Sequence, residues 1–368
     1  MQQPTAHRPT LCVLTPTPLL MVEVEPGEDE ASESADIHLH PGGQGLWVAG
    51  MADSLGADVT VCGPFGGEVG EVLARMLTDE HFTLRTVSYS AGNGAYIQDR
   101  RSGDRTTLAH MVPEPLTRHE LDDLYGTVLV EALECDVVVI TGAEPERVMP
   151  PGFFARLVRD LRSADKTIVA DLSGEIAKAV AAEGPTVLKM SHEELIDAGW
   201  AADESLEALQ EAGRDLVGNG VGAMLISRGG EPTLLLTEDA AHLLVGPVVT
   251  PLDHRGAGDS MTAGVAVALG RGATITEAAQ LGAAAGALNV TRRGLGTGHR
   301  EQIERFASQI RIEDANHARQ DGAGAKTQDG ADAQDGADAQ HSTDAHDSTV
   351  AQDAADTPDR DEPEGAEV

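Results

Sequence analysis

The sequence predicts an α/β protein in which helices cover both faces of a mostly parallel sheet, with a small lid of β-strands beside it. Short, continuous apolar runs alternate with amphipathic stretches over most of the chain. This alternation is typical of strands that are buried on both faces and joined by helices. Two segments instead have the pattern of antiparallel strands. With 368 residues, 41% of them hydrophobic, the chain can bury a large core.

The alternation begins near the N-terminus and predicts each element in turn. The strand runs are rich in Val, Ile and Leu, which suit a pleated surface. The helix stretches repeat apolar residues at the spacing of one buried helix face. We expect strands at 11–14, 59–62, 137–140, 167–170, 186–189, 223–227 and 243–249, and helices at 45–55, 68–77, 117–133, 152–162, 206–218 and 262–269.

Two segments depart from this alternation and predict the lid. Residues 19–40 are extended and alternate polar with apolar side chains. Residues 94–110 resemble a hairpin that turns around residues 101–104. Antiparallel excursions from an α/β sheet commonly cover the ligand site. We therefore place the lid at about residues 19–41 and 92–112.

The composition changes near Ile312. Residues 313–368 hold 16 acidic and 3 basic residues, and the segment Gln-Asp-Gly-Ala-Asp-Ala begins at both Gln328 and Gln334. Such a segment buries too little apolar surface to offset the entropy lost on ordering. The sequence thus predicts a folded domain over residues 10–312 and an acidic, disordered tail over 313–368.

The net charge disfavours two classes of partner, and the cysteines indicate a reducing compartment. The formal net charge is −35, which disfavours nucleic acid and anionic membranes, because both bind basic surfaces. No stretch is long and apolar enough to predict a membrane span. The three cysteines, Cys12, Cys62 and Cys135, lie far apart and form no CxxC pair. We expect buried, reduced cysteines in a cytoplasmic protein.

The most specific motif runs from Asp253 to Asp259 and contains Gly256, Ala257 and Gly258. Backbone N–H groups of these three small residues would lie at the N-terminus of the following helix. There they could bind an anion and stabilise charge on a transferring phosphoryl group. Asp259, in the first turn, could accept the proton of an attacking hydroxyl. The alternative is a structural glycine turn with an acidic residue at a helix N-terminus.

A second glycine-rich segment, from Pro41 to Gly45, opens another predicted helix, and its glycines would let the backbone approach a ligand closely. Together the two segments resemble the two signatures of the PfkB carbohydrate kinases, the ribokinase-like family. The similarity covers about residues 10–312 and is greatest to the branch of 1-phosphofructokinase and tagatose-6-phosphate kinase. The further matching segments, in the family's order, begin at Thr15, Thr141, Val169, Lys189 and Ser227.

The resemblance implies a ribokinase-like three-layer α/β/α sandwich and ATP-dependent phosphorylation of a hydroxyl on a sugar or related small molecule. It makes Asp259 the base and Gly256, Ala257 and Gly258 the anion hole. It implies nucleotide contacts by Lys189, Ser191, Glu194, Ser227 and Gly229. Glu194 would order water around Mg²⁺, which keeps several of its waters. The acceptor would lie against Gly42, Gly43, Gln44, Trp47 and Asp253. Whether the protein needs a monovalent cation, and whether it forms a homodimer through the lid, stay open.

The acceptor side departs from the family pattern. Met21 stands where the branch has an Asp, Gln44 where the signature has a Lys, and Trp47 where it has an Asn. His254 and Arg255 stand where the family prefers Thr, and no clear equivalent of a Thr-Arg-x-Asn stretch occurs near Asn93. Recognition of a phosphorylated sugar normally uses charge-assisted hydrogen bonds. These departures therefore favour an acceptor that carries no phosphate.

Three functions stay open at this stage. The first is a kinase for an unphosphorylated sugar or related molecule. The second is a 1-phosphofructokinase-type sugar-phosphate kinase, in which Arg100 or Arg255 would compensate for the missing Lys. The third is a non-catalytic sugar or nucleotide sensor, which the lost acceptor residues favour and the intact Asp259 motif disfavours.

Overall fold

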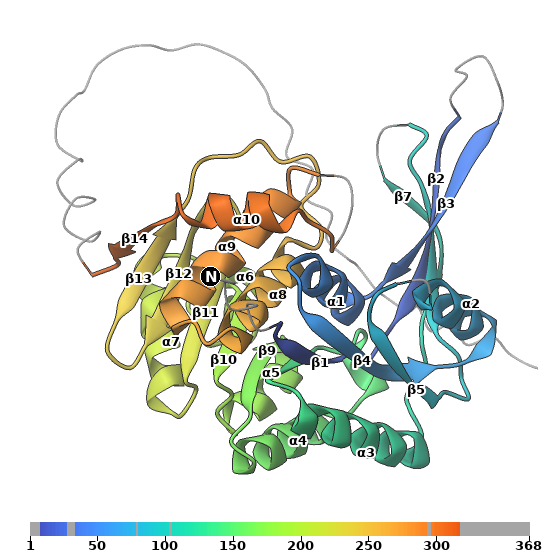
Figure 1. Ribbon diagram of the computed structural model, residues 1–368, viewed down its shortest axis with the longest axis horizontal. Coiled ribbons are helices and arrows are strands. Elements are labelled where there is room, and N and C mark those ends of the chain that lie inside the picture. The colour runs from blue at the N-terminus through green and yellow to red at the C-terminus, as the bar shows by residue number, and fades with distance from the viewer. Residues whose placement is uncertain (1–7, 28–33, 79, 103–104, 293–295, 317–368) are drawn as a thin grey trace, which may run out of the picture. The chain divides into compact units, whose positions relative to one another are not determined.

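The protein contains one large sheet and one small sheet, and the predicted α/β class is confirmed (Figure 1). The structure, a computed structural model, describes residues 8–27, 34–78, 80–102, 105–292 and 296–316. The predicted tail from residue 317 onward lies outside the described residues. No helix in the described part of the chain is long and apolar enough to cross a membrane.

The large sheet has ten strands in the order β14-β13-β12-β11-β10-β9-β8-β1-β4-β5. Its parallel strands are β1 (Thr10–Leu14), β4 (Asp58–Phe65), β5 (Thr83–Ser88), β8 (Val137–Thr141), β9 (Thr167–Asp171), β10 (Val187–Ser191) and β11 (Ala223–Arg228). Strand β8 consists of Val, Ile and Thr and is buried throughout, as expected for a central parallel strand. An antiparallel edge follows, formed by β12 (Glu231–Thr237), β13 (Ala241–Val245) and β14 (Arg311–Asp314).

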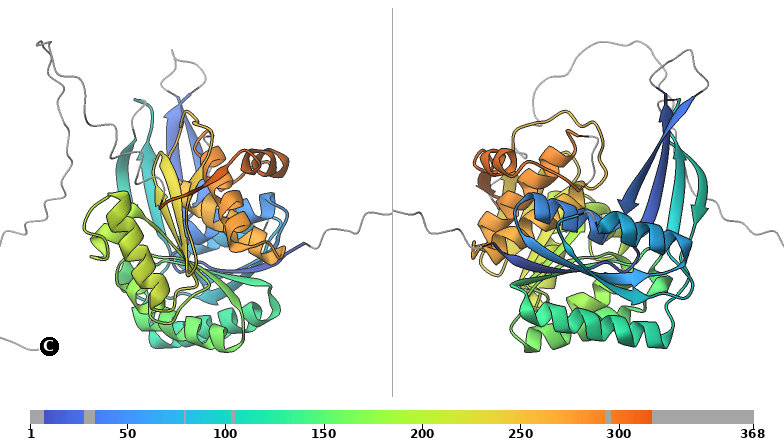
Figure 2. Two further views of the ribbon diagram at one scale, coloured as in Figure 1. Left: turned by 90° about the vertical axis from the view of Figure 1, so that its left-hand side faces the viewer. Right: turned by 45° about the vertical axis from the view of Figure 1, so that its right-hand side comes forward.

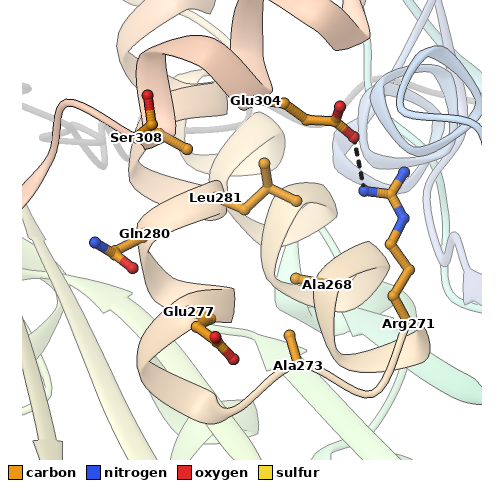
Figure 3. Close-up of a pocket in the computed structure, with 9 residues that line it drawn as sticks. Ala268, Arg271, Ala273, Glu277, Gln280, Leu281, Glu304 and Ser308 are labelled. Carbon is orange, nitrogen blue, oxygen red and sulfur yellow. Dashed lines mark hydrogen bonds and ion pairs between the residues drawn. The ribbon is translucent and has the colours of Figure 1, made fainter.

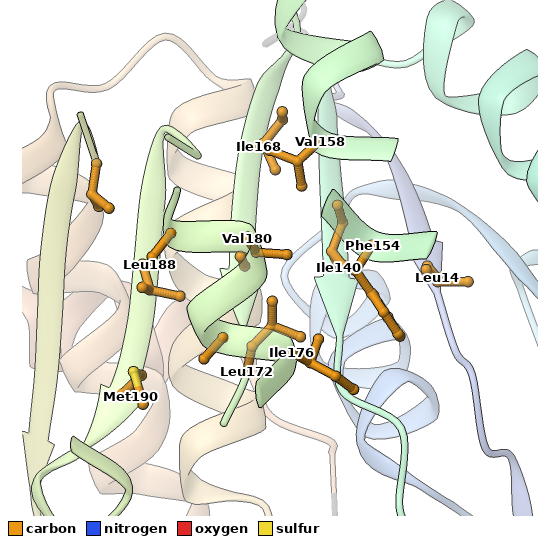
Figure 4. Close-up of a cluster of buried hydrophobic side chains, with 14 of the residues drawn as sticks. Leu14, Ile140, Phe154, Val158, Ile168, Leu172, Ile176, Val180, Leu188 and Met190 are labelled. Atoms are coloured by element: carbon orange, nitrogen blue, oxygen red, sulfur yellow. The ribbon is translucent and has the colours of Figure 1, made fainter. Parts of the chain in front are cut away.

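Helices cover both faces of this sheet, each over its own hydrophobic cluster. One face carries α3 (Arg118–Glu134), α4 (Pro151–Ser163), α5 (Gly174–Ala181), α6 (His192–Asp197) and α7 (Leu206–Gly218). The other carries α1 (Gln44–Ser54), α2 (Gly67–Leu77), α8 (Ala257–Gly270), α9 (Ile275–Asn289) and α10 (Arg300–Ala307). A short 3-10 helix spans Glu146–Val148. In Figure 4, Phe154 of α4 and Ile176 of α5 lie over Ile140 of the sheet.

The small sheet stands away from the large one (Figure 2). Its strands come from the two segments predicted as a lid, and we call it the lid sheet. Its order is β3-β2-β6-β7, with β2 (Leu19–Pro26), β3 (Ala35–Gly42), β6 (Gly94–Asp99) and β7 (Thr106–Met111). The pairing register aligns Met21, His40, Tyr96 and His110 across the four strands. Glu23 lies two residues beyond Met21 and therefore on the same face.

Two sequence predictions need correction at the C-terminal side of the fold. The strand predicted at 243–249 is β13, which ends at Val245 because Gly246 and Pro247 follow and Pro has no N–H for a ladder. The folded part also continues past the predicted boundary at residue 312, since β14 includes Asp314. Ala315 is buried, its N–H donates to the carbonyl of Ala241 (2.9 Å), and its carbonyl accepts from Gln210 Nε2 (3.1 Å).

Candidate active site

The N-terminus of α8 is the centre of the candidate site. The helix begins at Ala257 after Gly256, whose φ of 69° is a left-handed conformation that glycine adopts without strain. Asp259 therefore lies in the first turn, as predicted, and is 8% exposed. The first N–H groups of a helix have no partner within it. The chain thus places the first N–H groups of a helix and a buried carboxylate side by side, a combination that can serve phosphoryl transfer to a hydroxyl.

A buried polar cluster ties α8 to the sheet. Lys189 of β10 lies opposite Asp171 of β9 in the strand register, and its Nζ is 3.0 and 3.2 Å from the two carboxylate oxygens. Thr262 of α8 donates its hydroxyl to Asp171 Oδ2 at 2.6 Å. All three side chains are buried. Sequence reasoning gave Asp171 no role and missed Thr262, because only folding brings β9, β10 and α8 together.

Lys189 also lies against the anion hole. A Cβ atom at Gly258 would be only 2.5 Å from Lys189 Nζ, so the ammonium group comes directly against the backbone at that position. A cation next to free N–H donors strengthens a site for phosphate oxygens. The glycine at position 258 is thus explained by close approach, and Lys189, a predicted nucleotide residue, also lies against the predicted anion hole.

The electrostatics of this cluster suit proton transfer. Burial raises the pKa of Asp259 to about 8, and the negative charges of Asp171 and Glu194 add to the rise while Lys189 opposes it. For Lys189, burial alone would lower the pKa, but Asp171, Glu194 and Asp259 raise it overall, so the ammonium stays charged. A carboxyl group whose pKa lies near neutrality is well matched to act as a general base.

The predicted nucleotide residues gather at the carboxyl ends of neighbouring strands. Ser191 and Ser227 lie opposite each other where β10 and β11 end, and Gly229 follows in the turn to β12. Ligands of open parallel sheets bind at this edge. Ser191 caps α6: its hydroxyl accepts from Glu194 N (3.1 Å), and Glu194 Oε2 accepts from Ser191 N (2.6 Å). This capping box holds the Glu194 carboxylate in a defined position.

The second glycine segment lies at the start of α1. Gly42 ends β3, Gly43 is the N-cap of α1, and Gln44 is its first residue. Gln44 Oε1 accepts a hydrogen bond from the backbone N–H of Gly142 (2.9 Å). Trp47, in the first turn, is only partly buried. Because α1 packs against α8, this segment lies beside the helix that carries Asp259.

Asp253, one of the predicted acceptor residues, is hydrogen-bonded to two arginines in the structure. Its Oδ1 accepts from the backbone N–H of Arg255 (3.0 Å), and its Oδ2 accepts from Arg105 (3.0 Å) and from the Arg255 side chain (3.3 Å). Arg255 also donates to Glu23 of the lid sheet at 3.1 Å, and Arg100 donates to the same carboxylate at 3.3 Å. Glu23 and its role were missed from the sequence, although a Glu inside an otherwise apolar run of β2 was a signal.

Met21 and Asn93, two further positions where the sequence departs from the family pattern, are buried and contact other parts of the chain. Met21 is 2% exposed and packs against Gly42. Asn93 is 2% exposed, accepts from Gly66 N (2.9 Å) and donates to the carbonyls of Pro18 and Pro64 (both 3.0 Å). Asn93 therefore joins three segments at the base of the lid sheet.

Two cavities lie near these elements. One, of about 250 Å³, opens at the base of the lid sheet and is lined by Thr17, Tyr96, His110, Glu144 and Arg147 among others. The other, of about 310 Å³, lies between α8, α9 and α10, with Arg271 bonded to Glu304 at its rim (Figure 3). This second cavity is at the C-terminal end of α8, roughly 18 Å along the helix from Asp259 at 1.5 Å per residue, so it takes no part in the site.

Comparison with known proteins decides the family. The sequence matches the model of the pfkB family carbohydrate kinases over residues 15–302. The chain belongs to this family. The prediction of an ATP-dependent carbohydrate kinase, a phosphotransferase with an alcohol group as acceptor, is thereby confirmed.

Two curated relatives show how this pfkB kinase compares in sequence. It is 28% identical over 274 residues to the ATP-dependent 6-phosphofructokinase isozyme 2 of Mycobacterium tuberculosis, covering 72% of this chain and 78% of the relative. It is 25% identical over 274 residues to the 1-phosphofructokinase of Bacillus subtilis, covering 74% and 88%.

Solved structures confirm the predicted ribokinase-like fold. Phosphofructokinase-2 from Escherichia coli superposes with a TM-score of 0.70 at 22% identity, covering 82% of this chain and 98% of that one. Ribokinase of Arabidopsis thaliana, solved with ribose and ATP, superposes with a TM-score of 0.59 at 18% identity, covering 82% and 99%.

Proposed function

We propose that this pfkB kinase transfers the γ-phosphoryl group of ATP to a hydroxyl of an unphosphorylated sugar or related small molecule. The observation that carries the proposal is the pairing of the three arginines next to the lid. Arg100 pairs with Glu23 and Glu25, Arg105 pairs with Asp253, and Arg255 pairs with both Glu23 and Asp253, so that three carboxylates face the three arginines. Neutralised in this way, these arginines offer little net charge to a phosphate on the acceptor.

In the proposed mechanism the site residues divide into four groups. Asp259 accepts the proton of the acceptor hydroxyl as its oxygen attacks the γ-phosphorus. The backbone N–H groups of Gly256, Ala257 and Gly258, together with Lys189, stabilise the charge on the phosphoryl oxygens. Ser191, Glu194, Ser227 and Gly229 border the nucleotide. The acceptor lies between the start of α1, with Gly42, Gly43, Gln44 and Trp47, and the lid sheet.

Mg²⁺ is the metal that this arrangement fits. The described residues contain no group of three or more His, Cys, Asp or Glu side chains arranged for a metal ion. Mg²⁺ bound with a nucleotide needs few direct protein ligands, because phosphates and waters fill most of its positions. Glu194, held by its capping box, would bond a water of the ion. The bound ion would supply positive charge to the phosphates.

The acceptor residues support an uncharged ligand. Gln44 is a neutral amide whose oxygen is already bonded to Gly142, and Met21 is buried and apolar. The half-buried Trp47 could cover the apolar face of a sugar ring.

A second candidate is a sugar-phosphate kinase, and one observation favours it. Arg147 lines the cavity at the base of the lid sheet together with Tyr96 and His110, outside the network of arginine pairs. Its guanidinium group could bind a phosphate on the acceptor. The curated relatives, named as 6-phosphofructokinase and 1-phosphofructokinase, point the same way.

A substrate panel separates these candidates. We would measure kcat/KM for fructose and tagatose beside fructose 1-phosphate, fructose 6-phosphate and tagatose 6-phosphate. A preference for any phosphate ester above about tenfold, near 1.4 kcal/mol of transition-state binding, would overturn the proposal. Loss of that preference in Arg147→Met would then identify the phosphate contact. Sugar binding without ATP turnover across the panel would instead support a non-catalytic sensor.

A homodimer formed through the lid sheet is also part of the proposal. Ile37 and Leu39 of β3 and Ile97 of β6 lie on one face, and their side chains are 62%, 46% and 38% exposed. Such an apolar face is typical of an interface. Sedimentation of the wild type and of Leu39→Glu would test it: a monomeric wild type contradicts the dimer. A tetrameric form is known for phosphofructokinase-2 of Escherichia coli.

A further inference from the structure

Arg255 lies between the lid sheet and α8, the helix that carries Asp259. It is the residue immediately before Gly256, the N-cap of α8. Any displacement of Arg255 therefore moves the first N–H groups of the anion hole. Its own backbone is held on the other side, because its carbonyl accepts a hydrogen bond from Asn289 Nδ2 of α9 at 2.6 Å.

The side chain of Arg255 joins two carboxylates from distant parts of the sequence. Its Nη2 is 3.1 Å from Glu23 Oε1 of β2 and 3.3 Å from Asp253 Oδ2 of its own loop. Two more lid arginines extend the network. Arg100 pairs with Glu23 at 3.3 Å and with Glu25 at 3.8 Å, and Arg105 pairs with Asp253 at 3.0 Å. The network thus connects three lid segments to the loop that leads into α8.

Both carboxylates that contact Arg255 are withdrawn from water. Glu23 is 6% exposed and Asp253 is 8% exposed. Burial alone would raise the pKa of each group, but the hydrogen bonds and charge of Arg255 lower both. A buried carboxylate that loses its partner is left uncompensated. Separation of the lid sheet from the loop would therefore cost free energy at both ends of the Arg255 contact.

We propose that Arg255 is a positioning residue that, through Glu23, couples docking of the lid sheet to the active shape of the anion hole. It acts through Gly256 and the N–H groups that follow and makes no contact with the reacting atoms. When the lid sheet docks, the Glu23 carboxylate fixes the guanidinium, and the guanidinium fixes the loop. When the lid sheet opens, the loop loses this restraint.

A double-mutant cycle with Arg255→Met and Glu23→Gln tests the coupling. Each single variant should lower kcat by about tenfold or more and leave the KM for ATP within about threefold. The double variant should be no worse than the poorer single variant, because both changes break one contact. Activity is measured with whichever panel sugar or sugar phosphate has the highest kcat/KM. A preferred phosphate ester would overturn the proposed acceptor but leave this test intact.

Hydrogen exchange of the ligand-free protein gives a second readout that needs no acceptor. Amides of β2 and β6 should exchange at least about threefold faster in Arg255→Met than in the wild type. Amides of β9 and β10, in the centre of the large sheet, should keep their rates. Thermal unfolding shows whether each variant folds. If Arg255→Met does not, Arg255→Lys and Glu23→Asp, which keep the charges but shorten the reach, complete the cycle with the same expectation.

Arg101→Met is the matched control. Arg101 pairs with Asp99 inside the lid sheet at 2.7 Å, and the guanidinium side chain is 54% exposed. This variant removes a lid arginine without touching the loop and should keep kcat within about twofold. The proposal is overturned if the effects of Arg255→Met and Glu23→Gln add, if only the KM for the acceptor rises, or if exchange in β2 stays unchanged.

Discussion

Asp259 is the residue on which the proposed chemistry depends most. It combines burial, a position in the first turn of α8 and a pKa near neutrality. Asp171 and Lys189 share its surroundings but are committed to each other by an ion pair. Of these groups only Asp259 is left to exchange a proton with an acceptor.

Replacement of this carboxyl group should remove catalysis and spare binding. We expect Asp259→Asn to lower kcat by about 10²–10⁴, because an amide keeps the shape of the side chain but cannot accept the proton. The affinity for ATP should change by no more than a few-fold. Retention of more than about a tenth of wild-type turnover would exclude Asp259 as the base.

The pH dependence of the reaction should report the same group. Because the pKa of Asp259 is about 8 and its deprotonated form is the base, log kcat/KM should fall with a slope near one as the pH drops below that value. Rate measurements between pH 5.5 and 9.5 at saturating ATP check this. A profile that is flat from pH 6 to 8 would contradict the assignment.

The free energy of unfolding should change with pH in the opposite direction to the rate. A carboxyl group with a raised pKa favours the folded state while it is protonated, and this stabilisation is lost as the pH rises from about 4 to about 8. Asp259→Asn stays neutral and avoids that loss. Its Tm relative to the wild type should therefore be higher at pH 8.5 than at pH 4.5.

At the next level, the buried contact among β9, β10 and α8 decides how these elements meet. The Asp171 carboxylate of β9 accepts hydrogen bonds from Lys189 of β10 and from Thr262 of α8. A hydrogen-bonded ion pair in a buried position is sensitive to loss of one partner, since the other charge remains without compensation. The cluster positions the catalytic helix on the sheet as well as supplying the cation near the anion hole.

Loss of the cation should destabilise the protein more than loss of the hydroxyl. Lys189→Met leaves Asp171 buried without its ion pair and should cost about 3–5 kcal/mol. Thr262→Val removes one hydrogen bond to a charged group and should cost about 1.5–3 kcal/mol. Urea unfolding measures both. As a control, Lys178→Met breaks the exposed pair with Glu175 and should change stability by no more than about 0.5 kcal/mol. A Lys189→Met protein as stable as this control would contradict the account.

At the scale of the whole chain, the last described strand holds the C-terminal end of the described residues against the large sheet. Strand β14 pairs with β13, Ile310 is 5% exposed, and Ala315 closes onto β13 and α7. Residues up to at least Ala315 therefore pack against the large sheet and its helices. The acidic composition beyond residue 316 predicts little apolar surface for further packing.

Two truncations should therefore behave differently. A chain that ends at Asn316 should keep Tm within about 2 °C and turnover within about twofold of the full chain. A chain that ends at Gln309 loses β14 with its ladder and two buried side chains, and its Tm should fall by at least about 5 °C. A large drop in the first chain would show that residues 317–368 stabilise the folded part.

The sequence alone was sufficient for most of the fold and for the catalytic motif. Apolar runs predicted the parallel strands other than β5, because those strands are buried on both faces, whereas β5 is mostly exposed. The Gly256–Asp259 segment predicted the start of α8 because glycine and acidic residues mark a helix N-terminus. The strands β5, β12 and β14 and the helices α5, α6, α9 and α10 were missed. Strand β14 is only four residues long and mostly exposed, so its sequence has no clear period.

Tertiary structure alone decided which charged groups meet. Glu23 and Arg255 are 232 positions apart in sequence, and Asp171 and Thr262 are 91 apart. No local pattern encodes such pairs, since each member reads as an ordinary polar residue until the strands and helices pack. The sequence therefore identified the groups that could do chemistry, because backbone geometry at a helix N-terminus is local. Their partners and the pKa of Asp259 depended on burial and through-space charge, which exist only in the folded chain.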